Sequence, residues 1–294
     1  MKLYAPGYYK KFKCIADKCE HSCCVGWEID IDDSTLEKYQ NLQNHYGAVI
    51  NNSISLEETP HFRLSCGERC PHLDERGLCR IILNLGEGYL CDICREHPRF
   101  YNFTSIAEVG IGMSCTEAAR IILNSPNYTV MEEVGTVDAS ADGIKFDGRA
   151  QREKIYSILG DESLSYSDRL CEIYREYDIS VGADGVWLAK LDSLEYLDDD
   201  HKKLFMNYSS ACRPNGADQY LERFLAYFIY RHCTEAVDVE DFCDRLTFCL
   251  FCERLFSSLI CLKDVGSLSD LASLASIISE EIEYSDDNTL SLIY

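Results

Sequence analysis

The sequence has little positive charge for its length. Its 28 Lys and Arg residues stand against 50 Asp and Glu residues, which gives a formal net charge of −22 and a pI near 4.6. A surface of this sign repels phosphate backbones, so we expect no nucleic-acid partner. Residues 1–120 carry 13 basic and 17 acidic side chains, whereas the remainder carries 15 and 33. The acidic residues of the C-terminal part either serve solubility alone or attract a basic, lysine-bearing partner.

Long apolar runs and targeting signals are also missing. The most apolar stretch, around Phe248 to Leu262, is interrupted by Glu253, Arg254 and two serines, and is too broken to span a membrane. Residues 1–14 are rich in Lys and Tyr and contain no apolar core of a secretory signal. We therefore predict a cytoplasmic protein with no membrane association.

Several familiar catalytic patterns are absent. The glycine pairs Gly86-x-Gly88 and Gly110-x-Gly112 are too short to be a dinucleotide-binding fingerprint. The sequence shows no P-loop, no Ser–His–Asp pattern and no contiguous C-x3-C-x2-C triplet of radical enzymes. It therefore designates no catalytic residue.

Cysteine, in contrast, is abundant, with 17 residues in the chain. In a cytoplasmic protein these thiols stay reduced, and reduced cysteines at short spacings are typical of metal ligands rather than of disulfides. Ten of them precede residue 120, and they are Cys14, Cys19, Cys23, Cys24, Cys66, Cys70, Cys79, Cys91, Cys94 and Cys115. We predict a metal-binding module in this part of the chain.

Spacing does not identify the metal. The pair Cys91-x2-Cys94 is suited to presenting two sulfurs to one ion. Structural zinc sites take four ligands, and iron–sulfur clusters also take four cysteines. The residues alone therefore leave zinc and iron–sulfur open.

A later C-x2-C pair receives a different interpretation. Cys249 and Cys252 lie in an apolar, helical stretch, where cysteines behave as small hydrophobic side chains. We predict that both pack in the core. The same prediction is made for Cys171, Cys212, Cys233, Cys243 and Cys261.

The expected fold is mainly α. An irregular Cys-rich metal-binding module over 1–125 is followed by a linker over 126–148 and by a helical acidic domain over 149–294. A capping box at Ser34-Thr35-Leu36-Glu37 predicts a helix that runs towards His45. Periodicity and helix-end signals predict further helices over 79–85, 115–122, 149–159, 167–177, 217–233, 239–262 and 268–284.

Residues 8–125 contain a series of ordered motifs. They are Phe12-Lys13-Cys14, Cys19, Cys23-Cys24-x-Gly26-Trp27, Cys70-Pro71-x-Leu73-Asp74-Glu75-x-Gly77-Leu78-Cys79, Leu90-Cys91-x2-Cys94, His97-Pro98-Arg99 and Ser114-Cys115-x-Glu117-Ala118-Ala119-Arg120. Together they resemble the flagellin lysine-N-methylase (FliB-type) family, whose Cys-rich module also occurs in small zinc- or iron-chelating proteins.

The resemblance implies methyl transfer from S-adenosylmethionine to lysine side chains of flagellin, and a 4Fe–4S cluster as cofactor. Cys66 is an addition relative to the family pattern, and Thr116 stands where the family has proline. The alternative is a non-enzymatic zinc- or iron-binding structural or interaction protein. The metal ligands that the resemblance implies are Cys14, Cys19, Cys23, Cys24, Cys70, Cys79, Cys91, Cys94 and Cys115.

Overall fold

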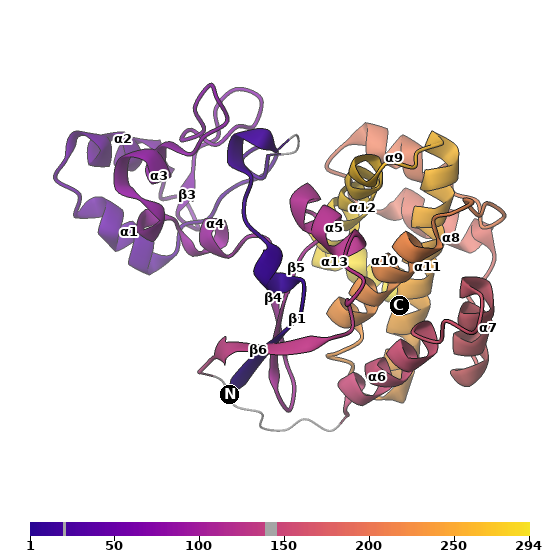
Figure 1. Ribbon diagram of the computed structural model, residues 1–294. Helices are drawn as coiled ribbons and strands as arrows, with labels where there is room; N and C mark the ends of the chain where they lie inside the picture. Colours follow the sequence, from indigo (N-terminus) through magenta and orange to yellow (C-terminus); the bar gives the residue numbers. More distant parts are fainter. Residues whose placement is uncertain (20–21, 139–145) are drawn as a thin grey trace. The chain divides into compact units, whose positions relative to one another are not determined.

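The chain divides into two compact units. A computed structural model describes residues 1–19, 22–138 and 146–294 (Figure 1). Met1–Phe12 and Arg99–Tyr294 form one unit, called here the helical unit. Lys13–Pro98 form the other, called here the cysteine-rich unit.

This division differs from the predicted one. The predicted module over 1–125 contributes its first twelve residues and everything after Pro98 to the helical unit. The reason is strand pairing, because β1 (Lys2–Pro6) pairs with β5 (Ala107–Ile111) and with β6 (Met131–Thr136). Strand β6 lies inside the predicted linker, and residues 139–145 of that linker lie outside the described residues.

The helical unit contains a four-stranded sheet with the order β4-β5-β1-β6, where β4 is Arg99–Phe103. Strand β5 runs antiparallel to β4 and parallel to β1, and β6 runs antiparallel to β1. All five residues of β5 are buried. A strand covered on both faces shows no polar–apolar alternation, which is why the sequence analysis missed it.

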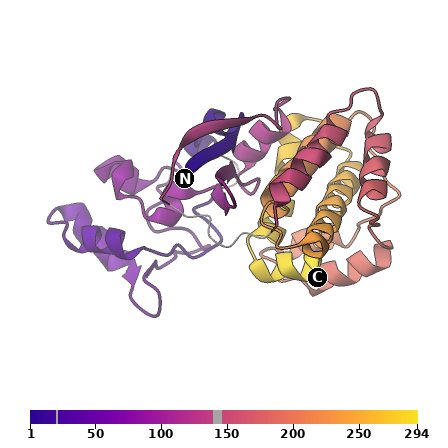
Figure 2. The ribbon, with the colours of Figure 1, turned by 90° about the horizontal axis from the view of Figure 1, so that it is seen from below.

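Helices make up the rest of this unit and confirm the mainly α fold. Helices α10 and α11 lie side by side (Figure 2) and pack through aromatic rings, with Phe224 and Phe256 stacked at 4.4 Å between centroids. The sequence did not predict α8, α9 or α13. The helices of the unit are α5 Thr116–Leu123, α6 Gly148–Leu159, α7 Tyr166–Glu176, α8 Asp184–Ser193, α9 Asp199–Phe205, α10 Asp218–His232, α11 Val239–Lys263, α12 Leu268–Glu283 and α13 Asp286–Ile293.

A buried ion pair joins α6 to the sheet. The Arg152 guanidinium donates to both carboxylate oxygens of Glu108 on β5, at 2.8 and 2.7 Å. It also donates to the Thr234 hydroxyl at 2.7 Å. Both charged side chains are 1% exposed. Such a bidentate pair fixes geometry strongly, because either partner alone would be a buried uncompensated charge.

The cysteine-rich unit is built from short elements around a small hydrophobic cluster. Its first helix differs from the prediction. Asp32, not Ser34, is the N-cap, and its carboxylate accepts from the Thr35 N–H at 3.0 Å. The helix ends at Gln40 and a second one begins at His45. The elements are α1 Asp33–Gln40, α2 His45–Ser53, β2 Ile54–Ser55, β3 His61–Phe62, α3 Arg80–Leu85 and α4 Asp92–Glu96, with 3-10 turns at Ala16–Lys18 and Glu87–Tyr89.

None of the helices in the described part of the chain combines the length and the apolar character that crossing a membrane requires.

Candidate metal centre

Five cysteines gather in the cysteine-rich unit. Cys70 and Cys91 are buried in its hydrophobic cluster, and Cys24, Cys79 and Cys94 pack against the same cluster. The negative charge of other thiolates of this set helps to raise the pKa of each of Cys70, Cys79 and Cys94. We call these five residues the thiol cluster.

Helix starts position three of these thiols. Cys79 is the N-cap residue of α3; burial raises the pKa of its thiol, and the nearby backbone of Ile82 and Ile81 opposes that rise. Cys91 is the N-cap residue of α4, and Cys94 lies within that helix. The first turn of a helix offers unpaired N–H donors and a positive dipole end, and both stabilise a thiolate.

Backbone pairing connects the two cysteine-containing segments of the sequence. The Cys70 N–H donates to the Cys24 carbonyl at 2.8 Å. Val25 and Arg69 form a β-bridge beside this contact. Two cysteines that are far apart in the chain are therefore brought to one place, which the spacing of the motifs alone could not show.

The thiols of the cluster differ in acidity. The hydrogen bond from the Cys23 thiol lowers the pKa of Cys24 to about 7. The Cys91 and Cys94 thiols share a hydrogen bond, which lowers the pKa of Cys91 and, together with burial, raises that of Cys94. Burial raises the pKa of Cys70 to about 12. The cluster thus offers both readily ionised sulfurs and sulfurs whose ionisation needs a nearby cation.

The other predicted ligands are not part of the hydrophobic cluster, although the Cys23 thiol lies beside that of Cys24. Cys14 and Cys23 are exposed, as is Cys66, and Cys19 is half-buried. Cys115 belongs to the helical unit, where it is the N-cap residue of α5 and packs against that unit's core.

The donor chemistry of the thiol cluster suits a soft metal. Sulfur ligands favour zinc and iron–sulfur clusters over calcium or magnesium. In the described residues, no three His, Cys, Asp or Glu side chains form a group with the geometry of a metal site. The metal centre and its ligands therefore stay a prediction, supported by the donor type and by the placement of the five thiols.

Two residues that the sequence analysis missed form hydrogen bonds that join elements of the cysteine-rich unit. Asp32 accepts from the Asp92 N–H at 2.9 Å through its second carboxylate oxygen, so one side chain caps both α1 and α4. His72 is buried and bonds the Tyr46 and Ser53 hydroxyls at 3.0 and 2.9 Å. Burial lowers the pKa of His72 to about 4, so it stays neutral. The signal for Asp32 was its place before Ser34-Thr35, an N-cap position.

The seven later cysteines divide between core and surface. Cys233, Cys249 and Cys252 are completely buried, which confirms the predicted core packing of the C-x2-C pair. Cys171 and Cys212 are exposed, so the core prediction for these two is wrong. Cys243 and Cys261 are half-buried. Cys171 lies on the outer face of α7, a short helix that covers the core on one side only.

The chain is similar to proteins of known name. It is 29% identical over 161 residues to the flagellar biosynthetic protein FliU of Salmonella muenchen, and the match covers 52% of this chain and 94% of FliU. It is 29% identical over 139 residues to lysine-N-methylases of Salmonella typhimurium and Salmonella choleraesuis. Those matches cover 44% of this chain but only 34% of each lysine-N-methylase.

No protein-family profile and no solved structure matches the chain. The similarity to the two lysine-N-methylases confirms the predicted resemblance to that family.

Proposed function

We propose that this protein is an S-adenosylmethionine-dependent methyltransferase that acts on lysine side chains of flagellin in the cytoplasm. The observation that carries the proposal is the similarity to two lysine-N-methylases. The name of a further relative, a flagellar biosynthetic protein, supports flagellin as the substrate.

We further propose that the cysteine-rich unit holds a 4Fe–4S cluster. Bound iron–sulfur clusters supply iron atoms that exchange electrons or accept a ligand. The thiol cluster has more sulfurs than the four that such a cofactor takes. The backbone N–H groups at the start of α3 would stabilise the thiolate of Cys79 in the bound state.

The reaction places two demands on the site. A lysine amine must lose its ammonium proton, and its nitrogen must align with the sulfonium methyl group. The new N–C bond then forms as the C–S bond breaks, and S-adenosylhomocysteine leaves. A water-poor surface that holds the amine neutral would supply much of the rate.

Charge favours a lysine-bearing substrate. After residue 120 the chain carries 33 acidic and 15 basic side chains. A negative surface accelerates encounters with a basic partner, and this effect weakens as salt screens it.

The alternative function is a non-enzymatic zinc- or iron-binding protein. It is favoured by one observation, that the matches cover only 34% of each lysine-N-methylase but 94% of FliU. In this alternative the metal stabilises the cysteine-rich unit and no methyl group is transferred.

The decisive experiment uses the full chain purified without oxygen. We expect brown protein that contains iron and sulfide, binds S-adenosylmethionine in a calorimetric titration and adds methyl groups to flagellin lysines, detected by mass spectrometry. The matched control is Cys249→Ala/Cys252→Ala, which should behave as the wild type. Colourless protein with stoichiometric zinc, no cofactor binding and no methylation would favour the alternative.

A further inference from the structure

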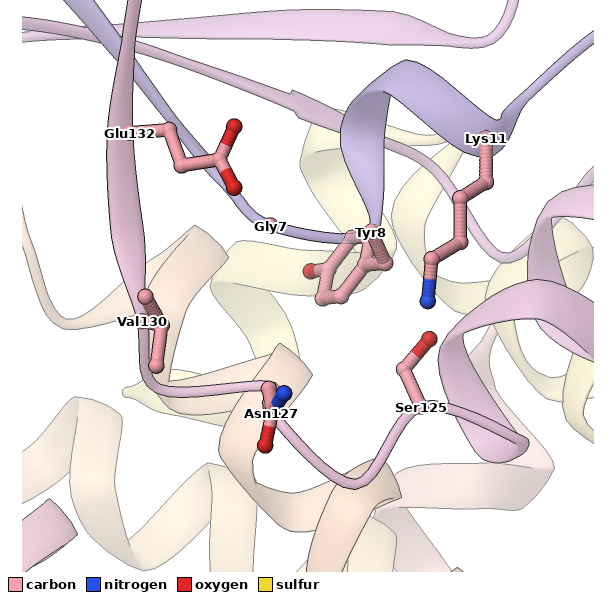
Figure 3. Close-up of a pocket in the computed structure, with 7 residues that line it drawn as sticks. All are labelled: Gly7, Tyr8, Lys11, Ser125, Asn127, Val130 and Glu132. Carbon is pink, nitrogen blue, oxygen red and sulfur yellow. The ribbon is translucent and has the colours of Figure 1, made fainter.

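A pocket in the helical unit lies where β1 ends and β6 begins (Figure 3). Its volume is about 230 Å³, and it is lined by Gly7, Tyr8, Lys11, Ser125, Asn127, Val130 and Glu132. Pockets that enclose a whole drug-sized ligand measure roughly 300–1,000 Å³. This one therefore fits a small molecule, or one end of a larger molecule.

One side of the pocket is positive. Lys11 forms no ion pair with any residue that the structure describes. Its ammonium group faces the Ser125 hydroxyl in Figure 3. That hydroxyl uses its hydrogen in a bond of 2.7 Å to the Ile121 carbonyl, so it can only accept from a further partner. The charge of Lys11 is thus available to an anionic group.

The opposite side is negative. A methyl group built on Gly7 would lie 3.5 Å from Glu132 Oε1, 3.6 Å from the Val130 carbonyl oxygen and 3.9 Å from the Asn127 carbonyl oxygen. An ammonium group in contact with Gly7 would therefore lie beside three oxygens. The Val130 oxygen already accepts from the Gly7 N–H at 2.8 Å and the Asn127 oxygen from the Val130 N–H at 3.3 Å, and each carbonyl keeps a second lone pair. This arrangement of acceptors suits an ammonium group.

A second lysine pairs with Glu132 from outside the pocket. Lys10 holds Glu132 Oε2 at 2.8 Å on the outside of the pocket. The other oxygen, Oε1, remains turned towards Gly7. Figure 3 shows Glu132 and Lys11 on opposite sides of the pocket, with the Tyr8 ring between them.

From this charge separation we infer that the pocket binds the zwitterionic group of an α-amino acid, with its carboxylate at Lys11 and its ammonium at the oxygens around Gly7. Two sources share this chemistry, a free amino acid and the methionyl end of S-adenosylmethionine. The second source rests on the proposed function, whereas the charge arrangement does not.

Three substitutions test the site. Lys11→Met removes the ammonium, and Glu132→Gln removes the negative charge. Gly7→Ala fills the oxygen cradle with a methyl group at ordinary contact distances, so the fold should tolerate it. The matched control is Lys2→Met, which removes the exposed Lys2–Glu133 salt bridge and leaves the pocket lining intact. Circular dichroism and thermal melting establish that each variant is folded.

The probes are S-adenosylmethionine, L-methionine and N-acetyl-L-methionine, which has no ammonium group, titrated into the full chain prepared without oxygen. We expect L-methionine to bind and the N-acetyl form to bind at least about tenfold more weakly, since a charged hydrogen bond is worth that much or more. The three pocket variants should lose a similar factor, and Lys2→Met should stay within about twofold of the wild type.

Competition identifies the source of the ligand. If L-methionine displaces S-adenosylmethionine, the methionyl end occupies the pocket; if it binds without displacing it, the ligand is a free amino acid. Equal binding of the N-acetyl form, or unchanged affinities in all three pocket variants, overturns the inference. Suppose that the folded pocket variants bind L-methionine normally and methylate flagellin with an unchanged KM for S-adenosylmethionine. That result would refute the pocket but leave the proposed function intact. If the pocket variants lose L-methionine binding but the wild-type protein methylates no flagellin, the pocket is supported and the proposed function is refuted.

Discussion

The two units contain the same short motif in opposite settings. Cys91-x2-Cys94 begins a five-residue helix, whereas Cys249-x2-Cys252 lies inside the 25-residue helix α11. At the helix start, backbone N–H groups have no carbonyl partner within the helix, and the nearby backbone of Cys94 contributes to lowering the pKa of Cys91. In the interior every N–H already bonds a carbonyl one turn earlier.

Burial is the second difference between the two cysteine pairs. Burial raises the pKa values of Cys249 and Cys252 well above the ordinary value, so both remain neutral thiols. Cys249 lies 3.8 Å from Cys233, sulfur to sulfur, in an apolar core. A C-x2-C pair at a helix start lies beside unpaired backbone N–H groups and so suits a metal ligand, whereas a pair inside a long buried helix packs as two neutral side chains.

The largest expected effect follows from exchanging these pairs for alanine. Cys91→Ala/Cys94→Ala should abolish metal binding and remove hydrogen-exchange protection across residues 13–98, because a thiolate-bound metal contributes folding energy directly and the unit's own hydrophobic cluster is small. Cys249→Ala/Cys252→Ala should leave the metal content unchanged. Metal analysis and exchange measured by mass spectrometry check both.

Chelation of the reduced wild type should reproduce the first result. Protection of residues 146–294 should persist in that sample, since the core of the helical unit contains no predicted ligand except Cys115 at its margin. Loss of metal from the Cys249→Ala/Cys252→Ala protein, or full protection of 13–98 after chelation, would contradict the comparison.

The helical unit should instead depend on buried charge. Arg152→Met leaves Glu108 buried without its partner and should lower the free energy of unfolding of this unit by about 3–5 kcal/mol. Replacing both, as Arg152→Met/Glu108→Gln, should recover a large part of that loss. Urea denaturation followed by tryptophan fluorescence in a Trp27→Phe background measures it, because the remaining tryptophan, Trp187, is buried in this unit. An equal loss in both variants would mean that packing, not charge, dominates.

Much of the helical unit could be predicted from the sequence. Helices α10, α11 and α12 begin and end within one residue of the predicted bounds. The apolar residues of α10 and α12 recur at the helical period, and α11 is a long apolar stretch that is buried on nearly all sides. The sheet was missed because β1 pairs with strands about a hundred residues later. No local pattern contains information on such pairing.

The sequence indicates which cysteines are candidate ligands, but not how they are arranged in space. Spacing marked Cys79, Cys91 and Cys94 as ligands, and the helix signals at residues 79–85 were correct. The contact between the Cys24 and Cys70 backbones and the double cap by Asp32 depend on tertiary folding. The exposure of Cys171 follows from its place on the outer face of α7, away from the buried Tyr166, Leu170 and Ile173, which the core prediction overlooked.

A smaller effect is expected from the double cap. Asp32→Ala removes acceptors from the N–H groups of Thr35 and Asp92 and should cost about 2 kcal/mol in the cysteine-rich unit, roughly 1 kcal/mol for each cap. Hydrogen exchange of α1 and α4 reports it. The control is Ser34→Ala, the residue that the capping box designated, which should cost less because Asp32 holds the cap.

The smallest effect concerns acid, which should destabilise the two units for different reasons. In the cysteine-rich unit protons compete with metal for thiolates. In the helical unit Asp241 accepts from Arg245 at 2.7 Å, from the Tyr294 hydroxyl at 2.6 Å and from the Val237 N–H at 2.9 Å. Burial opposes its ionisation, but these three donors outweigh burial and lower the pKa of Asp241 below its ordinary 3.8.

A lowered carboxyl pKa stabilises the folded state above the unfolded pKa, and that stabilisation is lost as the pH falls through the lower, folded value. Asp241→Asn keeps the shape of the side chain but removes its charge. It should therefore cost about 1–2 kcal/mol at pH 6, and this difference from the wild type should shrink steadily below about pH 4. Unfolding of the helical unit, followed by exchange in residues 239–294 at pH 6 and at pH 3, measures the change. A constant difference over this range would show that the hydrogen bonds of Asp241, and not its charge, stabilise the start of α11.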